Sequence, residues 1–402
     1  MRYWDAVFAF FAATAVAALV TPLAARLALR VNAVDMPRDR GLAERATPLL
    51  GGLAILAGVM VASAIWLPGT IRLPHAVGTR PGSGGLVHTW TLIAGACLIV
   101  LVGAIDDIVD LAPLTKLIGQ VAAALVVVEG GAVVTDVTIP FVGAASFPHA
   151  GGALTVIWLV GLMNVVNFSD GVDGLAAGLC AIDGIAFSII AFDLHVDPVG
   201  VLAALTAGAS LGFLFHNFHP ASVFMGDSGA NLLGYLLGVI AVVGSIKTGA
   251  VVALVVPLII LAVPFLDTGF VVAKRLKYGR KPWSADANHF HHRMARIGFS
   301  QRKTVAYLYG WTTMLAGVAV ALRFVPYHRH GHYHAGWLAL MIAIGLAALA
   351  ASVYLIYILE ILKFKSRRAR ELRDSDPDTS EFEVDESVQR DIETGEFERV
   401  GS

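Results

Sequence analysis

Long apolar stretches separated by short polar segments dominate the sequence. Eleven of them approach the roughly 20 residues that an α-helix needs to cross the hydrocarbon core of a bilayer. They are Ala6–Ala25, Leu49–Leu67, Trp90–Ile105, Leu114–Val128, Gly152–Val166, Leu175–Phe192, Val199–Phe215, Asn231–Ile246, Gly249–Ala273, Thr304–Leu322 and Trp337–Leu359. The pattern predicts an all-α, polytopic membrane protein with about eleven transmembrane helices.

The composition agrees with this prediction. Of the 402 residues, 57% are hydrophobic and 15% are charged, whereas roughly a quarter of the residues of a soluble domain are charged. The first apolar stretch lacks the basic segment of a signal peptide, so we expect it to be retained as a helix. We expect residues 1–365 to form the membrane domain and residues 366–402 to form a disordered, charged cytoplasmic tail.

The basic residues predict how the helices are oriented. With an odd number of helices the loops fall on two sides, and 23 of the 29 Lys and Arg residues lie on one of them. Basic loops remain in the cytoplasm. We therefore expect a multi-pass protein of the plasma membrane with its N-terminus outside and its C-terminus inside. This orientation places all four polar motifs described below on the cytoplasmic side.

The first motif is a pair of carboxylates, Asp106 and Asp107, which directly follow an uncharged apolar stretch. Charges at membrane depth are costly, and two adjacent like charges also repel each other. A bound cation such as Mg²⁺ would relieve that repulsion and bring phosphates with it. The alternative is a solvated helix end, with Lys116 nearby only reaching toward the interface.

The second motif consists of Asn164, Asn167, Asp170 and Asp173, which recur every third residue. This spacing predicts that one helical face presents two amides and two carboxylates, and Gly171 and Gly174 allow close backbone approach or a break. An ordinary turn rich in Asn, Asp and Gly is the alternative. The regular spacing between two apolar stretches favours a binding loop.

The third motif is Gly226-Asp227-Ser228-Gly229, which we expect to begin a helix. Backbone N–H groups at a helix N-terminus bind phosphate, although Asp227 alone could simply be an N-cap. Asp183, in the middle of a predicted span, is interpreted as a structural hydrogen-bonding group.

The fourth motif is a basic loop that ends in clustered histidines. Its candidate residues are Arg275, Lys281, His289, His291, His292 and Arg293. The positive-inside rule alone would explain the Lys and Arg residues. The histidines lack the acidic residue and the spacing of a zinc protease, so a diphosphate is a better partner than zinc.

Taken in this order, the motifs resemble those of the polyprenyl-phosphate N-acetylhexosamine-1-phosphate transferase superfamily, which is glycosyltransferase family 4. The matching segments are Gly103–Asp107, Asn164–Ala176, Phe224–Gly229 and Ser284–Arg293, together with Val34–Pro37, Pro48 and Gly51-Gly52 near the N-terminus. The His-x-His-His sequence and the number of predicted helices resemble the WecA/TagO-like branch.

The resemblance implies an all-helical membrane enzyme with its active site in a cytoplasmic groove. It would transfer a sugar phosphate from a UDP-sugar, UDP-GlcNAc in this branch, to undecaprenyl phosphate, with Mg²⁺ or Mn²⁺ as cofactor and UMP as product. The implied partners are these two substrates and membrane lipid. No nucleic-acid partner is expected, and a homodimer is left open. The MraY-like branch, which uses UDP-MurNAc-pentapeptide, is a close alternative.

The resemblance also implies roles for the motif residues. Asp227 would bind the metal with help from Asn167, and Asp107 would support Asp106 or contact the metal. Asp106 would act as a general base or hold the lipid phosphate. Lys116 and Asp173 would read the uracil, Asp170 would position the nucleotide, and Asn164 would contact substrate. The diphosphate and sugar would be bound by His289, His291, His292 and Arg293, with Arg275 and Lys281 behind them.

The chain departs from the superfamily pattern at a few positions. Gly41 and Ala43 stand where a Lys and a His are common, Leu49 replaces Arg, and Ala230 replaces Ser. These departures motivate one alternative, a protein that binds the lipid and sugar without turnover. A membrane transporter is the alternative from another class, because charged groups within spans also mark permeation paths.

Overall fold

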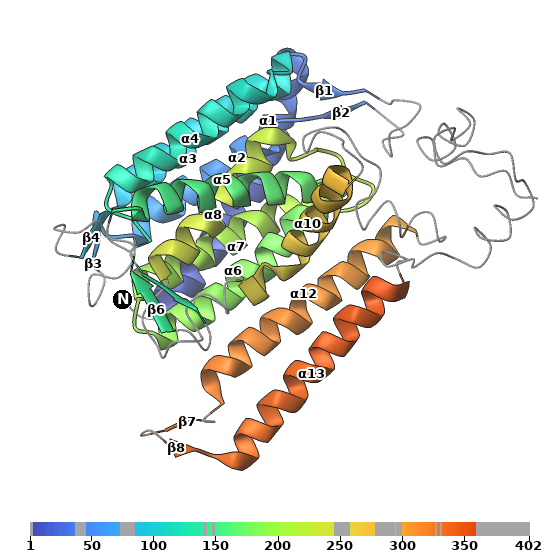
Figure 1. Cartoon of the computed structure of the whole chain (residues 1–402). Coiled ribbons are helices and arrows are strands. Elements are labelled where there is room, and N and C mark those ends of the chain that lie inside the picture. The colour runs from blue at the N-terminus through green and yellow to red at the C-terminus, as the bar shows by residue number, and fades with distance from the viewer. Residues whose placement is uncertain are drawn as a thin grey trace, which may run out of the picture.

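The computed structural model describes residues 3–36, 46–72, 85–134, 136–139, 143–146, 149–244, 258–277, 294, 300–325, 328–329 and 332–358. Within these ranges the chain is mainly helical, and the helices lie alongside one another (Figure 1). They are α1 (Tyr3–Arg30), α2 (Gly51–Trp66), α3 (Thr89–Val109), α4 (Pro113–Glu129), α5 (Gly151–Ser169), α6 (Leu175–Asp193), α7 (Asp197–Asn217), α8 (Gly226–Gly244), α10 (Ala262–Lys277), α12 (Gln301–Phe324) and α13 (Ala335–Ile358).

Each predicted apolar stretch overlaps one of these helices. In the described part of the chain, eight helices are long enough and apolar enough to cross a membrane. The helices α2, α4 and α10 are shorter, with 16, 17 and 16 residues. The all-α, polytopic fold is therefore confirmed, whereas the count of eleven spans and the side that faces the cytoplasm stay predictions.

Short antiparallel hairpins connect several helices. The pairs are β1 (Val34–Asp35) with β2 (Thr47–Pro48), β3 (Thr70–Arg72) with β4 (Leu86–His88), β5 (Asp136–Ile139) with β6 (Gly143–Ser146), and β7 (His328–Arg329) with β8 (His332–Tyr333). The β1–β2 hairpin lies at one end of the bundle, and β3–β4 and β7–β8 lie at the other end (Figure 1). Strand β5 contains three β-branched residues, Val137, Thr138 and Ile139, which favour extended structure.

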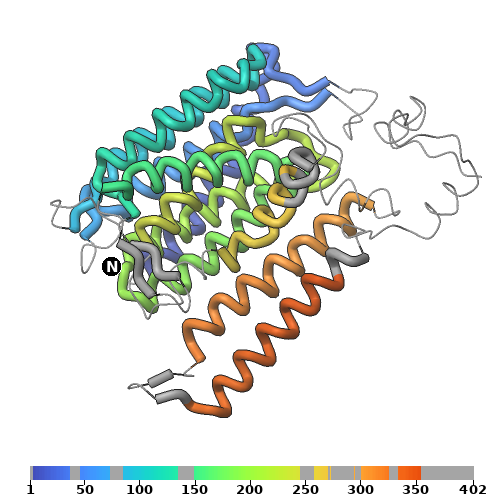
Figure 2. Tube along the Cα trace, viewed as in Figure 1, coloured from blue at the N-terminus to red at the C-terminus, as the bar shows by residue number. Residues whose placement is uncertain are grey.

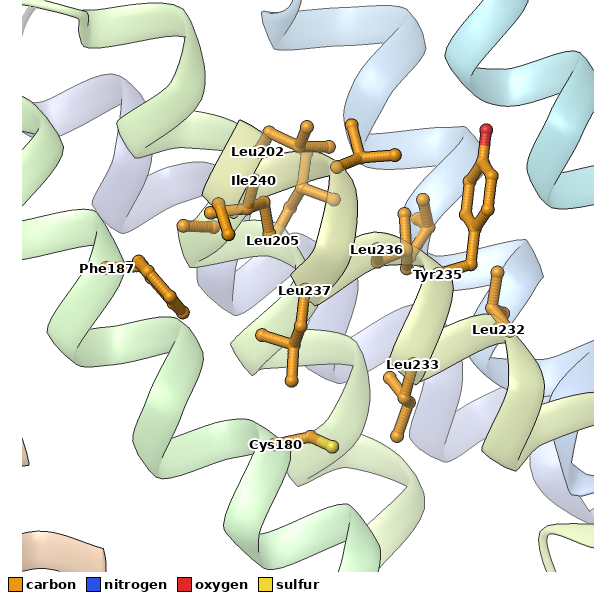
Figure 3. Close-up of a cluster of buried hydrophobic side chains, with 14 of the residues drawn as sticks. Cys180, Phe187, Leu202, Leu205, Leu232, Leu233, Tyr235, Leu236, Leu237 and Ile240 are labelled. Atoms are coloured by element: carbon orange, nitrogen blue, oxygen red, sulfur yellow. The ribbon is translucent and has the colours of Figure 1, made fainter. Parts of the chain in front are cut away.

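Helix α8 lies in the middle of the bundle, and it is the most enclosed of the eight candidate spans. Its side chains Leu233 and Leu237 pack near Cys180 of α6, and Ile240 lies near Leu202 of α7 (Figure 3). Because α8 is buried on all sides, its N-terminal end is fixed by its neighbours. That end carries Asp227, the central residue of the third motif.

The C-terminal helices α12 and α13 form a pair beside the main bundle (Figure 2). Helix α12 packs on α6, and an ion pair between Arg323 and Asp193 joins their distal ends. The indole N–H of Trp311 in α12 donates a hydrogen bond to Ser352 of α13 at 2.8 Å. The Tyr309 hydroxyl of α12 donates to the Gly174 carbonyl, so this pair also touches the loop that follows α5.

Candidate active site

The first and third motifs meet where the end of α3 touches the start of α8. Asp107 accepts hydrogen bonds from two backbone amides of α8, from Asp227 at 2.7 Å and from Ser228 at 3.3 Å. The first N–H groups of a helix have no partner within it, and the helix dipole favours a negative charge beside them. Asp107 therefore caps α8 from another helix and fixes the position of Asp227.

This contact requires glycine on both sides. A Cβ atom at Gly103 would lie 2.4 Å from the Cα atom of Ser228, and one at Gly226 would lie 2.4 Å from the Oδ2 atom of Asp107. Gly226 also has a φ of +68°, a conformation that residues with a side chain rarely adopt. The two glycines allow α3 and the first turn of α8 to approach to backbone contact.

The N-terminal motif supports the same turn. The backbone amides of Gly51 and Gly52 donate to the carbonyls of Phe224 and Met225, each at 3.1 Å, and the amide of Phe224 donates to the carbonyl of Pro48 at 2.9 Å. The start of α2 therefore holds the segment before Asp227. This contact explains why Pro48, Gly51 and Gly52 belong to the same site although they lie far from it in the sequence.

Lys116, at the start of α4, forms ion pairs with two carboxylates. Its Nζ atom lies 2.6 Å from Asp106 and 3.1 Å from Asp227. The other carboxylate oxygen of Asp106 accepts a hydrogen bond from the Leu111 amide at 2.7 Å. The Asp106 side chain is buried, whereas that of Lys116 is 33% exposed. The ammonium group reduces the repulsion between carboxylates that converge from α3 and α8.

The second motif is only partly helical. Helix α5 ends at Ser169, Asp170 is its C-cap, and Gly174 adopts a φ of +78°. The expectation that one helical face carries all four residues is therefore corrected: Asn164 and Asn167 lie on the helix, and Asp170 and Asp173 lie in the following turn. The physical reason is the pair of glycines, Gly171 and Gly174, which favour a chain reversal.

Asn167 and Asp170 nevertheless lie close to the carboxylates of α3 and α8. The Asn167 side chain forms a hydrogen bond with the Asp227 carboxylate. Burial, followed by the negative charges of Asp227, Asp107 and Asp173, raises the pKa of Asp170 to about 8. Two of these charges, Asp107 and Asp227, belong to α3 and α8, so the end of α5 lies near the junction of these helices. Below, "the carboxylate cluster" means Asp106, Asp107, Asp170 and Asp227.

Asp173 and Asn164 have defined protein partners. The Oδ2 atom of Asp173 accepts hydrogen bonds from the His219 ring at 2.8 Å and from the Ala221 amide at 3.0 Å. The Asn164 side-chain nitrogen donates to Gln120 of α4 and to the Val160 carbonyl, both at 2.8 Å. Asp173 thus lies at the edge of the cluster, and Asn164 lies behind it.

The donor atoms suit Mg²⁺. Asp227 and Asn167 offer oxygen ligands side by side, and Mg²⁺ prefers oxygen and usually takes only one or two protein carboxylates, the rest coming from water and substrate phosphate. In the described residues no group of three or more His, Cys, Asp or Glu side chains is arranged to hold a metal by itself. The oxygen donors therefore fit a magnesium ion that is shared with a phosphate substrate.

Several predicted residues cannot be placed. Lys281, His289, His291, His292 and Arg293 lie outside the described residues, and for Arg275 only the backbone, in α10, is described. Conversely, Gln120 and His219 have defined contacts at the site that were not predicted from the sequence. A single amide within an apolar stretch was the available signal for Gln120, and the Asn217-Phe-His219-Pro220 segment next to the third motif was the signal for His219.

Comparison with known proteins agrees with this arrangement. Residues 89–245 match the family described as Glycosyl transferase family 4, a range that contains Asp106, Asp107, Asn164, Asn167 and Asp227. The chain is 33% identical, over 366 residues, to a probable undecaprenyl-phosphate N-acetylglucosaminyl 1-phosphate transferase of Bacillus subtilis, covering 89% of this chain and 94% of that protein.

Two further relatives have names that specify other substrates. The chain is 38% identical over 323 residues to the decaprenyl-phosphate N-acetylglucosaminephosphotransferase of Mycolicibacterium smegmatis, covering 75% of this chain and 78% of that protein. It is 33% identical over 288 residues to the phospho-N-acetylmuramoyl-pentapeptide-transferase of Desulforamulus reducens, covering 66% and 78%. The similarity extends over less of this chain for the muramoyl-pentapeptide enzyme than for the other two.

Proposed function

The chain belongs to glycosyl transferase family 4, on the WecA/TagO-like branch of the polyprenyl-phosphate sugar-1-phosphate transferases, and from this premise we propose that it transfers GlcNAc-1-phosphate from UDP-GlcNAc to undecaprenyl phosphate and releases UMP. The observation that carries the proposal is the convergence of Asp106, Lys116 and Asp227 from three helices at one end of the bundle. Such a product would begin the synthesis of a cell-envelope glycopolymer.

The proposed site binds two anionic substrates. Asp227 and Asn167 would hold Mg²⁺, which neutralises pyrophosphate charge and stabilises the charge that develops during phosphoryl transfer. Asp107 keeps the first turn of α8 in place through its two amide hydrogen bonds. Asp170, beside these residues, would orient the nucleotide.

Asp106 and Lys116 act on the lipid phosphate in this proposal. The Leu111 amide and Lys116 hold both oxygens of Asp106, so the carboxylate is oriented before substrate binds. A phosphate monoester is already largely ionised near pH 7, and Asp106 therefore needs to accept only its last proton. Lys116 is a third exposed and can turn toward a bound phosphate or uracil.

The two rival functions predict different polar patterns. A transporter would need its polar groups near the middle of the membrane, whereas the described carboxylate cluster lies at helix ends. A binding protein without turnover would keep the same residues, so only activity separates it from an enzyme. Identity and matched length taken together favour UDP-GlcNAc over UDP-MurNAc-pentapeptide: the N-acetylglucosamine enzymes are 38% identical over 323 residues and 33% over 366, whereas two muramoyl-pentapeptide enzymes are 33% identical over 288 residues and 30% over 344.

The test is an assay of UMP release by purified protein in detergent, where no transmembrane gradient exists. We expect UMP to form only with UDP-GlcNAc, undecaprenyl phosphate and Mg²⁺ together, and to stop when EDTA is added. Replacing UDP-GlcNAc by UDP-GalNAc or UDP-MurNAc-pentapeptide should lower the rate. Absence of UMP with every nucleotide sugar would contradict enzymatic function, and a preference for the pentapeptide substrate would overturn the proposed sugar.

The cytoplasmic position of the site is a separate part of the proposal. Single cysteines are introduced at Ser300, near the start of α12, and at Gly69, before β3, in a protein in which Cys97 and Cys180 have been replaced. We expect these two positions to lie on opposite sides of the membrane. In intact cells a membrane-impermeant maleimide should label the cysteine at Gly69 and not the one at Ser300. The reverse labelling pattern would place the site outside.

A further inference from the structure

Three side-chain amides form a continuous hydrogen-bonded series behind the carboxylate cluster. Asn164 of α5 donates to the Oε1 atom of Gln120 in α4 at 2.8 Å, and Gln120 donates to the Oδ1 atom of Asn231 in α8 at 2.8 Å. Asn231 then donates to the backbone carbonyl of Asp227 at 2.8 Å. Gln120 and Asn231 are almost fully buried, with exposures of 4% and 5%.

The direction of this series is fixed by its last member. A backbone carbonyl can only accept, so Asn231 must turn its NH₂ group toward Asp227 and its oxygen toward Gln120. Gln120 must then donate to Asn231 and accept from Asn164. Each amide orientation therefore follows from the one after it, and no member can flip alone without placing two donors or two acceptors face to face.

We propose that Gln120 and Asn231 are positioning residues of the active site, which hold the Asp227 backbone and leave Asn164 with only its carbonyl oxygen for a ligand. Both N–H groups of Asn164 are already used, by Gln120 and Val160. Asn164 can thus accept from a substrate N–H or O–H group or bind a cation, but it cannot donate to phosphate. This inference rests on the proposed function in that Asp227 is taken as the metal ligand.

The physical basis is the same as for residues that support metal ligands in other enzymes. Hydrogen bonds to the neighbours of a ligand fix its orientation, and their loss typically lowers metal affinity or activity roughly 10- to 100-fold. The series joins three separate helices, α4, α5 and α8, in a buried region where an unpaired amide is costly. Asp107 holds the N–H side of the first turn of α8, and Asn231 holds its carbonyl side.

The experiment compares four variants of the full-length protein in detergent: two of Gln120, one double variant and one control. Gln120→Met removes the amide with little change in shape, and Gln120→Leu removes it with a branched side chain, so neither variant can donate to Asn231. The matched control is Ser188→Ala, which removes another buried hydrogen bond between helices, from Ser188 to the Gly200 carbonyl, near the opposite end of α6. The measurements are Mn²⁺ binding in the presence of UMP by electron paramagnetic resonance, the melting temperature, and kcat for UMP release.

We expect both Gln120 variants to weaken Mn²⁺ binding about tenfold or more and to lower kcat by a similar factor. Ser188→Ala should leave Mn²⁺ binding and kcat within about twofold of wild type. It should lower the melting temperature about as much as the Gln120 variants do, because each substitution removes a buried hydrogen bond between helices. Adding Asn231→Leu to Gln120→Met should weaken Mn²⁺ binding little further, because residues that act as one unit are not additive.

Other outcomes would overturn the inference. If the Gln120 variants lower only the melting temperature, as the control does, these residues are structural and do not position the site. Wild-type protein that binds no Mn²⁺ would overturn it as well. Failure of the proposed function looks different: wild-type protein would release no UMP, while Mn²⁺ binding would still weaken in the Gln120 variants.

Discussion

Carboxylates within the described helices are accommodated in two different ways. In the carboxylate cluster, at the end of the bundle, Asp107 caps a helix and Asp106 and Asp227 share the Lys116 ammonium. Asp183, midway along α6, is completely buried, and neither of its oxygens has a hydrogen-bond partner within the described part of the chain, so the prediction that it is a structural hydrogen-bonding group was wrong. Helix ends supply unpaired N–H groups and room for a cation, whereas the middle of a helix supplies neither.

Asp106, Asp107 and Asp227 thus have hydrogen-bond or ion-pair partners, whereas Asp183 is buried without one in the described part of the chain. Holding several carboxylates together at one site is unfavourable without a cation, and proteins retain such arrangements mainly where function requires them. An unpartnered buried polar group costs about 1–3 kcal/mol. Substitutions in the cluster should therefore affect activity more than stability, and substitution of Asp183 should do the opposite.

The largest effect is expected for Asp227→Asn. The substitution removes a negative charge from the proposed metal ligand while keeping its shape, so the helix cap by Asp107 should persist. We expect UMP release to fall by roughly 100-fold or more, as when a principal stabilising group of a transition state is lost, with an unchanged melting temperature. Near-wild-type turnover at low Mg²⁺ concentration would contradict the assignment of Asp227.

Gly103→Ala tests the close contact that positions Asp227. The added Cβ would lie 2.4 Å from the Cα atom of Ser228, so α3 and α8 must separate. We expect a loss of about 1–3 kcal/mol of stability and a clear loss of activity, measured by thermal unfolding and UMP release. Gly161→Ala in α5 is the matched control, since nothing lies within 4 Å of its new Cβ and helix propensity favours alanine. Equal behaviour of the two variants would refute the packing argument.

Asp183→Ala tests the other side of the comparison. Removing two unpartnered oxygens should raise the free energy of unfolding by about 1 kcal/mol, because the gain exceeds the penalty of a small cavity. Activity should stay within twofold of wild type. A less stable or inactive variant would show that Asp183 has a favourable interaction and belongs with the functional carboxylates.

Lys116→Met asks how much the ammonium group contributes to the cluster. Without it, Asp106 and Asp227 lose a competing cation, so we expect Mn²⁺ to bind roughly two- to fivefold more tightly, a range set by the partial exposure of the ion pair. UMP release should nevertheless fall, because Asp106 loses its orientation. Unchanged Mn²⁺ affinity in an electron paramagnetic resonance titration would mean that Lys116 does not compete with the metal.

The last prediction concerns the pH dependence of stability, through Asp170. Its pKa is raised to about 8 in the folded protein, above the value near 3.9 of an unfolded chain. Between these values the folded state binds more protons, so stability should fall as pH rises from about 4 to 8. In metal-free protein, Asp170→Asn should flatten the melting temperature between pH 5 and pH 8. An identical slope in both proteins would assign the pH dependence to another group.

Much of the fold could be predicted from the sequence, because hydropathy and helix length are local properties. Each apolar stretch overlaps a helix in the described part of the chain, and the expectation that Asp227 stands at a helix start was confirmed. The continuous helix through Asn164, Asn167, Asp170 and Asp173 was wrong. The spacing of polar residues suggested it, but the two glycines in the turn were the stronger signal.

The division of roles within the site could not be predicted in the same way. Asp106 and Asp107 are neighbours in the sequence and chemically identical, yet one pairs with Lys116 and the other caps α8. Successive side chains of a helix point about 100° apart, so the two face different neighbours. Which neighbours these are depends on how α3, α4 and α8 pack.

The sequence by itself determined that this is an all-α membrane protein, that its polar motifs are ordered as in one transferase family, and which residues are candidates for phosphate chemistry. Apolar length and motif order are written along the chain and need no knowledge of packing. Only the tertiary structure decided that Lys116 reaches Asp227 and that Gln120 reaches Asn231, both across 111 residues of sequence. Such contacts arise because buried polar groups must find partners wherever helix packing brings them, and the position of a distant helix is a property of the whole fold.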